Sequence, residues 1–149
     1  MRNTMGWLDK LVGKDEMIKD LNHIAIVVSD MDRAIEFYTE VLGLRLILDG
    51  RPKGGEKKSF LGTKSKAIVA LSENKNRTVQ KGEYVDGVNH VAFGVDDLEK
   101  SSRILKDRGV QFVEIKVGED GKPNAYHFLD PDGLELEIYG DTGKEVPQY

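Results

Sequence analysis

Two stretches of the chain share one pattern of apolar and polar positions. The first runs from Leu21 to Arg33, and the second runs from Val88 to Lys100. Each begins with an Asn-His pair, continues as an apolar run, reaches an acidic cluster and ends in a segment with helical spacing. The copies align without a gap, because His23 and His90 take the same place in each. A pattern repeated at a fixed interval indicates a repeated structural unit. The sequence therefore predicts a tandem duplication.

The apolar positions in each copy predict the same order of elements. Apolar runs rich in β-branched residues indicate strands, and apolar residues at intervals of three and four indicate helices. In the first unit we expect one strand, one helix and three further strands, at residues 21–28, about 31–42, 44–48, 60–61 and 67–71. In the second unit we expect the same order, at residues 88–95, 97–108, 110–117, 126–129 and 134–139. Both units are therefore predicted to be βαβββ modules of an α+β protein.

Local signals add detail to these elements. Ser29 and Asp32 form a possible capping pair for the first helix, and Gly43 supplies its stop. The strand at 21–28 is apolar on both faces, so we expect it to lie between two layers. The segment Asp130-Pro131-Asp132-Gly133 has strong turn chemistry and predicts a hairpin.

The repeat also predicts how the chain is organised. Residues outside the duplication are expected to form a short amphipathic helix from Thr4 to Val12, a charged connector and a loose tail. The predicted segments are the helix and connector at 1–20, the first module at 21–72, the linker at 73–87, the second module at 88–140 and the tail at 141–149. The two modules share one domain at 21–140, because 149 residues suit a single core.

Composition narrows the classes of function. The net charge is −4 and the pI is about 5.4, which argues against a nucleic-acid partner. The chain has no cysteine, so disulfides, thiolate nucleophiles and cysteine-based zinc sites are excluded. We find no apolar run of about 20 residues and no signal-peptide core, so we expect a cytoplasmic protein without a membrane partner.

The repeat also points to a candidate site. The two histidines are 67 residues apart, and the same interval places Ala70 opposite Glu137. Glu137 lies between Leu136 and Ile138 in an apolar strand, where desolvating a carboxylate costs several kcal/mol. A bound divalent cation compensates that cost, so we predict a metal at this carboxylate. Alternatively, both histidines are core residues and Glu137 pairs with a cationic side chain.

These residues resemble a known family. The Asn-His-aliphatic-Ala motif, the segment Asp30–Leu44 and the closing segment Phe128–Glu137 are similar to the vicinal oxygen chelate superfamily, which includes glyoxalase I, extradiol dioxygenases and fosfomycin-resistance enzymes. The resemblance implies paired βαβββ modules forming an open mixed β-barrel around one divalent metal per chain. By position, the metal ligands fall on His23, His90 and Glu137. The fourth ligand of glyoxalase I falls on Ala70 and is missing here.

The resemblance leaves the reaction open. Two histidines and one carboxylate are typical of Fe(II) oxygenases, so dioxygenase-type chemistry with Fe(II) is the first expectation. Zn, Mn, Ni or Co with lyase, isomerase or fosfomycin-type thiol-transferase chemistry is the alternative. A third hypothesis is a non-catalytic binding protein like the bleomycin-resistance members.

The remaining expectations concern the substrate and the partner. Extradiol dioxygenases usually carry Tyr at the position of His127, which we predict to act as an acid, a base or a hydrogen-bond donor; alternatively, it is a solvent-exposed strand histidine. We expect a small organic substrate that contacts Ala70 and Tyr139. We also expect the protein to form a homodimer, as many relatives do. Six basic residues of the first module form either a solvated charged face or a surface that attracts an anionic substrate. They are Arg51, Lys53, Lys57, Lys58, Lys64 and Lys66.

Overall fold

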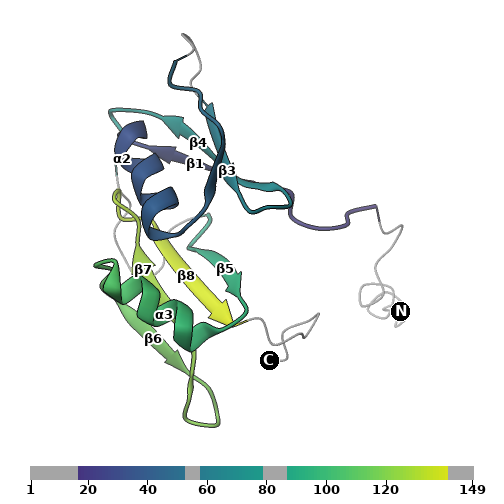
Figure 1. Ribbon diagram of the computed structural model, residues 1–149, viewed down its shortest axis with the longest axis vertical. Coiled ribbons are helices and arrows are strands. Elements are labelled where there is room, and N and C mark those ends of the chain that lie inside the picture. The colour runs from purple at the N-terminus through teal and green to yellow at the C-terminus, as the bar shows by residue number, and fades with distance from the viewer. Residues whose placement is uncertain (1–16, 53–57, 79–86, 141–149) are drawn as a thin grey trace, which may run out of the picture.

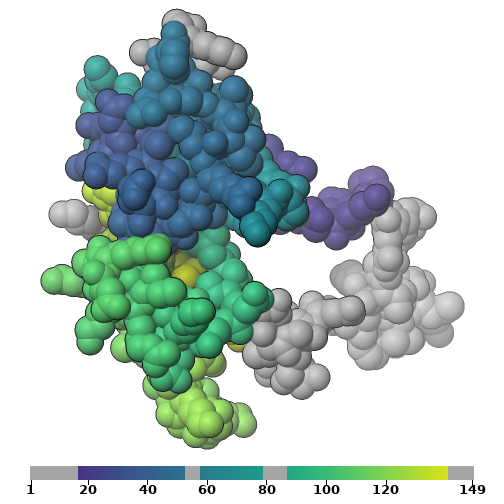
Figure 2. All heavy atoms as spheres, viewed as in Figure 1, coloured from purple at the N-terminus to yellow at the C-terminus, as the bar shows by residue number. Residues whose placement is uncertain are grey.

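The computed structural model describes residues 17–52, 58–78 and 87–140. The predicted helix at 4–12 and the predicted tail at 141–149 lie outside the described residues. The described part forms two modules, of which the first lies above the second in Figures 1 and 2. Both modules have the order βαβββ, as the repeat predicts, and the α+β class is confirmed. None of the helices in the described ranges is long and apolar enough to cross a membrane.

Each module contains one four-stranded mixed sheet. The strands of the first sheet are β1 (Ile24–Val28), β2 (Arg45–Leu48), β3 (Lys58–Gly62) and β4 (Ala67–Glu73). The strands of the second sheet are β5 (Val91–Val95), β6 (Glu114–Val117), β7 (Pro123–Leu129) and β8 (Glu135–Gly140). The strand orders are β1-β4-β3-β2 and β5-β8-β7-β6. The pairs β1–β4 and β5–β8 are parallel, and the other pairs are antiparallel. The two sheets remain separate among the described residues, so these strands form no closed barrel.

The duplication is visible in the register of the parallel strands. In the first sheet Ala25 lies beside Ala70, and in the second sheet Ala92 lies beside Glu137. Both partners in the second pair come 67 positions after their counterparts. The interval that relates the two histidines therefore also relates the strand that carries Glu137 to the strand that carries Ala70.

Each helix begins at an aspartate. In the first module α2 (Met31–Glu36) continues into a π-helical turn, η1 (Phe37–Val41), and the second module contains α3 (Leu98–Asp107). Asp30 and Asp97 have extended backbones, and their carboxylates accept hydrogen bonds from amides three residues later. Such bonds satisfy amide groups that have no partner within the helix. The predicted capping pair of Ser29 and Asp32 is wrong, because Asp30 caps the helix and the Ser29 hydroxyl donates to another module.

The π-helical turn makes the first helix longer than the second. The amide of Leu42 donates to the carbonyl of Phe37 at 3.2 Å, five residues earlier. The Thr39 hydroxyl donates to the carbonyl of Ile35 at 2.7 Å, a contact that often bends helices. The distance from the first helical residue to the glycine that ends the helix is therefore one residue longer from Met31 to Gly43 than from Leu98 to Gly109. Both glycines have positive φ, at 74° and 87°, so both end their helices as predicted.

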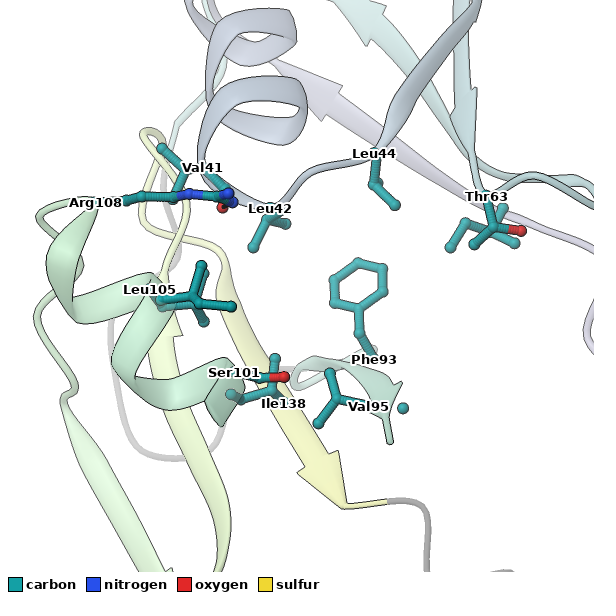
Figure 3. Close-up of a pocket in the computed structure, with 13 residues that line it drawn as sticks. Val41, Leu42, Leu44, Thr63, Phe93, Val95, Ser101, Leu105, Arg108 and Ile138 are labelled. Carbon is teal, nitrogen blue, oxygen red and sulfur yellow. Dashed lines mark hydrogen bonds between the residues drawn. The ribbon is translucent and has the colours of Figure 1, made fainter. Parts of the chain in front are cut away.

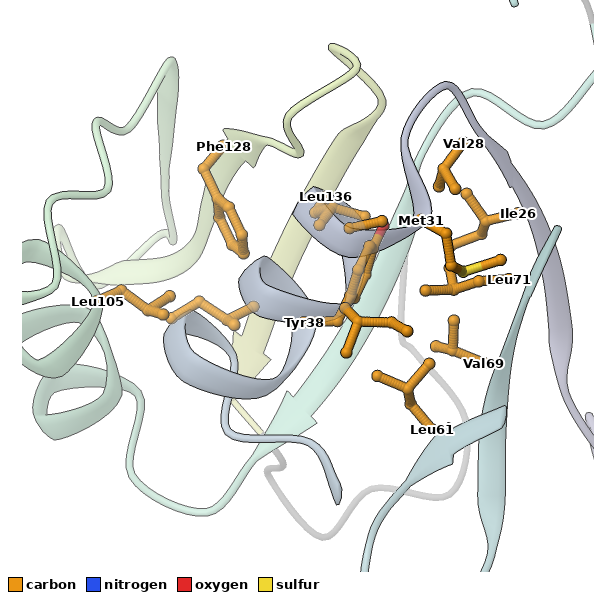
Figure 4. Close-up of a cluster of buried hydrophobic side chains, with 13 residues drawn as sticks. Ile26, Val28, Met31, Tyr38, Leu61, Val69, Leu71, Leu105, Phe128 and Leu136 are labelled. Atoms are coloured by element: carbon orange, nitrogen blue, oxygen red, sulfur yellow. The ribbon is translucent and has the colours of Figure 1, made fainter. Parts of the chain in front are cut away.

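The hydrophobic core lies around α2. Figure 4 shows side chains of both sheets pointing toward this helix, with Tyr38 fully buried among them. Ile26 and Val28 of β1 belong to this core, whereas Val27 is 46% exposed. The prediction that this strand is buried on both faces is therefore wrong, because the core covers one face of the sheet and leaves the other open. The core side chains with no exposed area are Val28, Tyr38, Leu61, Val69, Leu71, Phe128 and Leu136.

Two aspartates of the predicted turn join the modules. Asp132 accepts hydrogen bonds from the amide of Ser29 at 2.9 Å, from the Ser29 hydroxyl, and from Arg33 at 3.1 Å. Burial opposes ionisation, but the Ser29 bonds and the nearby arginines hold the pKa of Asp132 below its ordinary value. Asp130 accepts a hydrogen bond from the Tyr38 hydroxyl at 3.0 Å. Burial raises the pKa of Asp130. Burial and the nearby charge of Asp130 raise the pKa of Tyr38. The turn therefore also connects the second module to the first.

Candidate metal centre

Three side chains meet on one face of the second sheet. The register aligns Ala92 of β5, Glu137 of β8 and His127 of β7 in one row across the strands. His90 lies just before β5, and its Nε2 is 2.9 Å from Oε2 of Glu137. The Nε2 of His127 is 3.3 Å from the same oxygen. Glu137 is only 7% exposed, so two imidazoles surround a buried carboxylate.

The other ring nitrogen of each site histidine has its own partner. The Nδ1 of His90 lies 2.9 Å from the side-chain oxygen of Asn89, and the Nδ1 of His127 lies 2.7 Å from Oε1 of Glu135. A hydrogen bond at one ring nitrogen decides which tautomer is present and frees the other nitrogen to bind a metal. At His90 the other nitrogen, Nε2, is the one that faces Glu137.

His23 lies on the other sheet. It precedes β1, its Nδ1 is 2.8 Å from the side-chain oxygen of Asn22, and its ring packs edge-on against Phe60 at 6.4 Å between centroids. His23 therefore repeats the Asn-His arrangement of His90. Within the described residues, however, its ring does not gather with His90 and Glu137 within 4.8 Å. The structure brings two of the three predicted ligands together in one chain.

Glu135 belongs to this site but was not among the residues predicted from the sequence. Together with His127 and Glu114, it forms a group whose possible ligand atoms lie within 4.8 Å of one another. Glu114 is exposed and pairs with Lys116 at 2.6 Å, whereas His127 is only 4% exposed. The available signal was spacing, because Glu135 precedes Glu137 by two positions in one strand and therefore lies on the same face. The alternative of a solvent-exposed strand histidine is wrong for His127, because the sheet and both carboxylates cover the ring.

The two predicted substrate positions lie on the open faces of the two sheets. Ala70 is 4% exposed and lies between Ala25 of β1 and Phe60 of β3. Tyr139 is 42% exposed and lies two residues beyond Glu137 on the same face. Their contact with a substrate stays a prediction.

Some of the basic residues of the first module have acidic partners. Arg51 pairs with Asp49 at 2.7 Å and with Asp32 at 2.9 Å, and Lys66 pairs with Asp20 at 3.6 Å. Lys53 and Lys57 lie outside the described residues. These ion pairs favour a solvated charged face over an anion-binding site.

A separate cavity lies between the modules. Its volume is about 320 Å³, and most of its lining is apolar (Figure 3). Leu42 and Leu44 line it from the first module, and Phe93 and Leu105 line it from the second. Arg108 bridges the modules at this cavity by donating to the carbonyl of Val41 at 2.8 Å. None of the predicted site residues lines this cavity.

The protein belongs to the Glyoxalase/Bleomycin resistance protein/Dioxygenase superfamily, whose pattern matches residues 20–138. The match includes both Asn-His pairs and Glu137. The family resemblance expected from the sequence is therefore confirmed.

Individual relatives include enzymes of two kinds. The metallothiol transferase FosB of Staphylococcus epidermidis is 28% identical over 89% of each chain. The lactoylglutathione lyase of Schizosaccharomyces pombe is 32% identical over 82% of this chain and 47% of that longer protein. Among solved structures, the fosfomycin resistance protein FosX of Listeria monocytogenes, complexed with Mn(II) and 1S,2S-dihydroxypropylphosphonic acid, shares the fold with a TM-score of 0.68 and 20% identity. The match covers 85% of this chain and 95% of that chain.

The donor atoms at Glu137 suit a divalent metal. Imidazole nitrogen and carboxylate oxygen are ordinary ligands of Zn, Mn, Fe, Co and Ni. The 2.9 Å between Nε2 of His90 and Oε2 of Glu137 is a separation that two ligands of one ion can have. A metal at this position would also neutralise a carboxylate that is buried beside two histidines.

Proposed function

We propose that the protein is a divalent-metal-dependent enzyme that transfers a thiol to a small substrate with neighbouring oxygens, or isomerises such a substrate. The observation that carries this proposal is the buried Glu137 carboxylate with two histidine Nε2 atoms around it. Metallothiol transferases and lactoylglutathione lyases among the relatives support this reaction class.

The proposed metal ligands are His23, His90 and Glu137. A metal held there supplies Lewis-acid polarisation of substrate oxygens. We propose an ion such as Mn(II) or Zn(II), which the Mn(II) of the FosX complex supports. His127 lies beside the ligand Glu137, so its Nε2 is in place to exchange a proton or a hydrogen bond with a substrate at the metal. Ala70 and Tyr139 are the proposed substrate contacts.

We propose that the complete ligand set forms between two copies of the chain. His23 lies on the first sheet and the His90–Glu137 pair on the second, so a homodimer that places one copy's first sheet against the other's second sheet would unite them. Both open faces expose apolar side chains that such pairing would cover. They are Val27 and Leu48 on the first sheet, and Leu129 and Tyr139 on the second.

Mixing two variants tests the shared site. His23→Ala and Glu137→Ala each remove one ligand, and a mixed dimer retains one complete set. We expect each variant alone to bind little Mn(II) or Zn(II), and the mixture after unfolding and refolding together to regain binding. Binding that stays absent in the mixture, while the wild type treated alike binds metal, would refute a site shared between copies.

The metal and the reaction need a second experiment. Elemental analysis of protein purified without chelators should find about one metal per wild-type chain and little in Glu137→Ala. Glu99→Ala, which removes an exposed carboxylate of α3, is the control and should keep its metal. Anaerobic incubation with Mn(II) or Zn(II), a thiol and fosfomycin should give a thiol adduct. Loss of the ligand Glu137 should lower the rate by more than about 100-fold, since even outer-shell partners cost 10–100-fold.

Dioxygenase chemistry with Fe(II) is the second candidate. It is favoured by the ligand set of two histidines and one carboxylate, with Ala70 in place of a fourth ligand. Iron in the purified protein and oxygen-dependent turnover of a catechol would support this candidate. No metal in the wild type, even after reconstitution, would instead support a non-catalytic binding protein.

A further inference from the structure

We propose that Glu135 is a positioning residue that keeps the proton of His127 on Nδ1 and thereby directs the Nε2 lone pair toward the metal site. The inference rests on the proposed function for its catalytic meaning. The tautomer itself follows from the geometry of the chain.

The two contacts of the His127 ring differ in length. Nδ1 lies 2.7 Å from Oε1 of Glu135 and meets the geometry of a hydrogen bond. Nε2 lies 3.3 Å from Oε2 of Glu137, beyond the ordinary N–H···O range of 2.7–3.2 Å. A neutral imidazole has one N–H and one lone pair. The shorter contact is the one that needs the proton, so Nδ1 donates to Glu135 and Nε2 is left as an acceptor.

The surroundings of the ring hold it in this orientation. His127 is 4% exposed, and its ring packs edge-on against His90 with 5.4 Å between centroids. Glu135 and Glu137 project from one face of β8, so the same strand supplies the orienting carboxylate and the proposed metal ligand. A ring fixed between them cannot turn its Nε2 away without breaking the 2.7 Å bond.

The other two histidines follow the same rule. Asn22 and Asn89 place a side-chain oxygen at Nδ1 of His23 and of His90, which leaves Nε2 as the nitrogen that can bind a metal. In His90 this nitrogen lies 2.9 Å from Oε2 of Glu137. For His23 and His90, Nε2 is the proposed ligand atom. For His127 the partner is a carboxylate, which also stabilises the imidazolium that forms when Nε2 takes a proton from a substrate.

Glu135→Gln changes the tautomer with little change in shape. Glutamine replaces the carboxylate at Nδ1 with a neutral amide whose NH₂ can donate, so the remaining carboxylate, Glu137, 3.3 Å from Nε2, should draw the proton to Nε2. His127 then presents an N–H to the metal site in place of a lone pair. The change removes a base, and loss of a general base lowers rates by about 100-fold or more.

Nitrogen NMR of the three histidines measures the tautomer directly. Protein labelled with ¹⁵N-histidine at pH 8, free and loaded with Zn(II), gives six ring-nitrogen signals, and His127→Ala assigns two of them. We expect His127 to carry its proton on Nδ1 in the wild type and on Nε2 in Glu135→Gln. Glu114→Gln is the matched control, since it removes a carboxylate of the same cluster that pairs with Lys116, and it should keep the wild-type tautomer.

The outcomes separate this inference from the metal proposal. A proton on Nε2 in the wild type, or a proton that stays on Nδ1 in Glu135→Gln, would overturn the role of Glu135. Failure of Zn(II) to move the Nε2 signals of His23 and His90 would overturn the metal site instead. In the thiol-transfer assay, Glu135→Gln should lower kcat about 100-fold with KM and bound Zn(II) unchanged; a lower Zn(II) content would indicate a structural role and refute the proposal.

Discussion

Asp132→Asn should destabilise the protein, whereas Asp130→Asn should leave its stability nearly unchanged, although the two residues share one turn. Asp132 accepts from both the amide and the hydroxyl of Ser29, and asparagine would turn an NH₂ group toward one of these donors. A hydrogen bond to a charged group contributes about 1.5–3 kcal/mol, and the exposed Arg33 pair adds at most about 1 kcal/mol. We therefore expect Asp132→Asn to lower the free energy of unfolding by about 2–3 kcal/mol.

Urea denaturation followed by circular dichroism measures this loss. With an m-value of about 1.5–2 kcal/mol per molar, the midpoint should fall by about 1–2 M. Asp130→Asn should change the midpoint by less than about 0.5 M. Asparagine keeps an oxygen for the amides of Asp132 and Leu134, its NH₂ can donate to the Tyr38 hydroxyl, and the substitution removes a charge whose burial is unfavourable. Equal losses in the two variants would refute this account of the turn.

The pH dependence supplies an independent check. The pKa of Asp132 is lower in the folded protein than in the unfolded chain, where it is about 3.9. Its contribution to stability is therefore fully present above about pH 4 and is lost as the pH falls through the folded pKa. The difference between wild type and Asp132→Asn should be constant from pH 7 to 5 and shrink toward pH 3. A constant difference over the whole range would contradict the assigned charge.

Three further substitutions test the fold by thermal and urea unfolding. Asp97→Ala removes the cap of α3 and should cost about 1 kcal/mol, whereas Asp96→Ala, one residue before the cap, should stay within about 0.5 kcal/mol. Leu61→Ala should lower the free energy of unfolding by about 2–5 kcal/mol, because the Leu61 side chain has no exposed area. A smaller loss would mean that the surrounding core collapses into the space left by the leucine. Gly43→Ala should lower the free energy of unfolding by about 1 kcal/mol, because a φ of 74° is unfavourable for a residue with a Cβ. The added Cβ meets no close contact, so an unchanged stability would refute the backbone strain.

The sequence predicted the repeat of elements well, since apolar periodicity and glycine stops are local signals. Its strands at 60–61 and 126–129 are too short, because backbone pairing extends β3 to Lys58 and β7 to Pro123, beyond the apolar residues. The grouping of His90 with Glu137 was implied by the family resemblance, because the 67-residue interval related each of these residues only to its counterpart in the first module. The separation of His23 from His90 and Glu137 was not predicted, because it depends on how the two modules pack through contacts such as that of Tyr38 with Asp130. Glu135 was missed because an acidic residue beside a turn ordinarily faces solvent.

The π-helical turn at Phe37–Val41 shows how duplicated modules can differ in the length of one helix while their strands keep the same register. The first copy contains one more residue between the helix start and the terminal glycine than the second copy does. Ala25 and Ala70 are nevertheless as far apart in the sequence as Ala92 and Glu137, because the first module has one residue fewer between Gly43 and Ala70 than the second has between Gly109 and Glu137. The wider winding at Phe37–Val41 therefore accommodates one more helical residue in the first module, while the paired strands keep the same spacing in both modules.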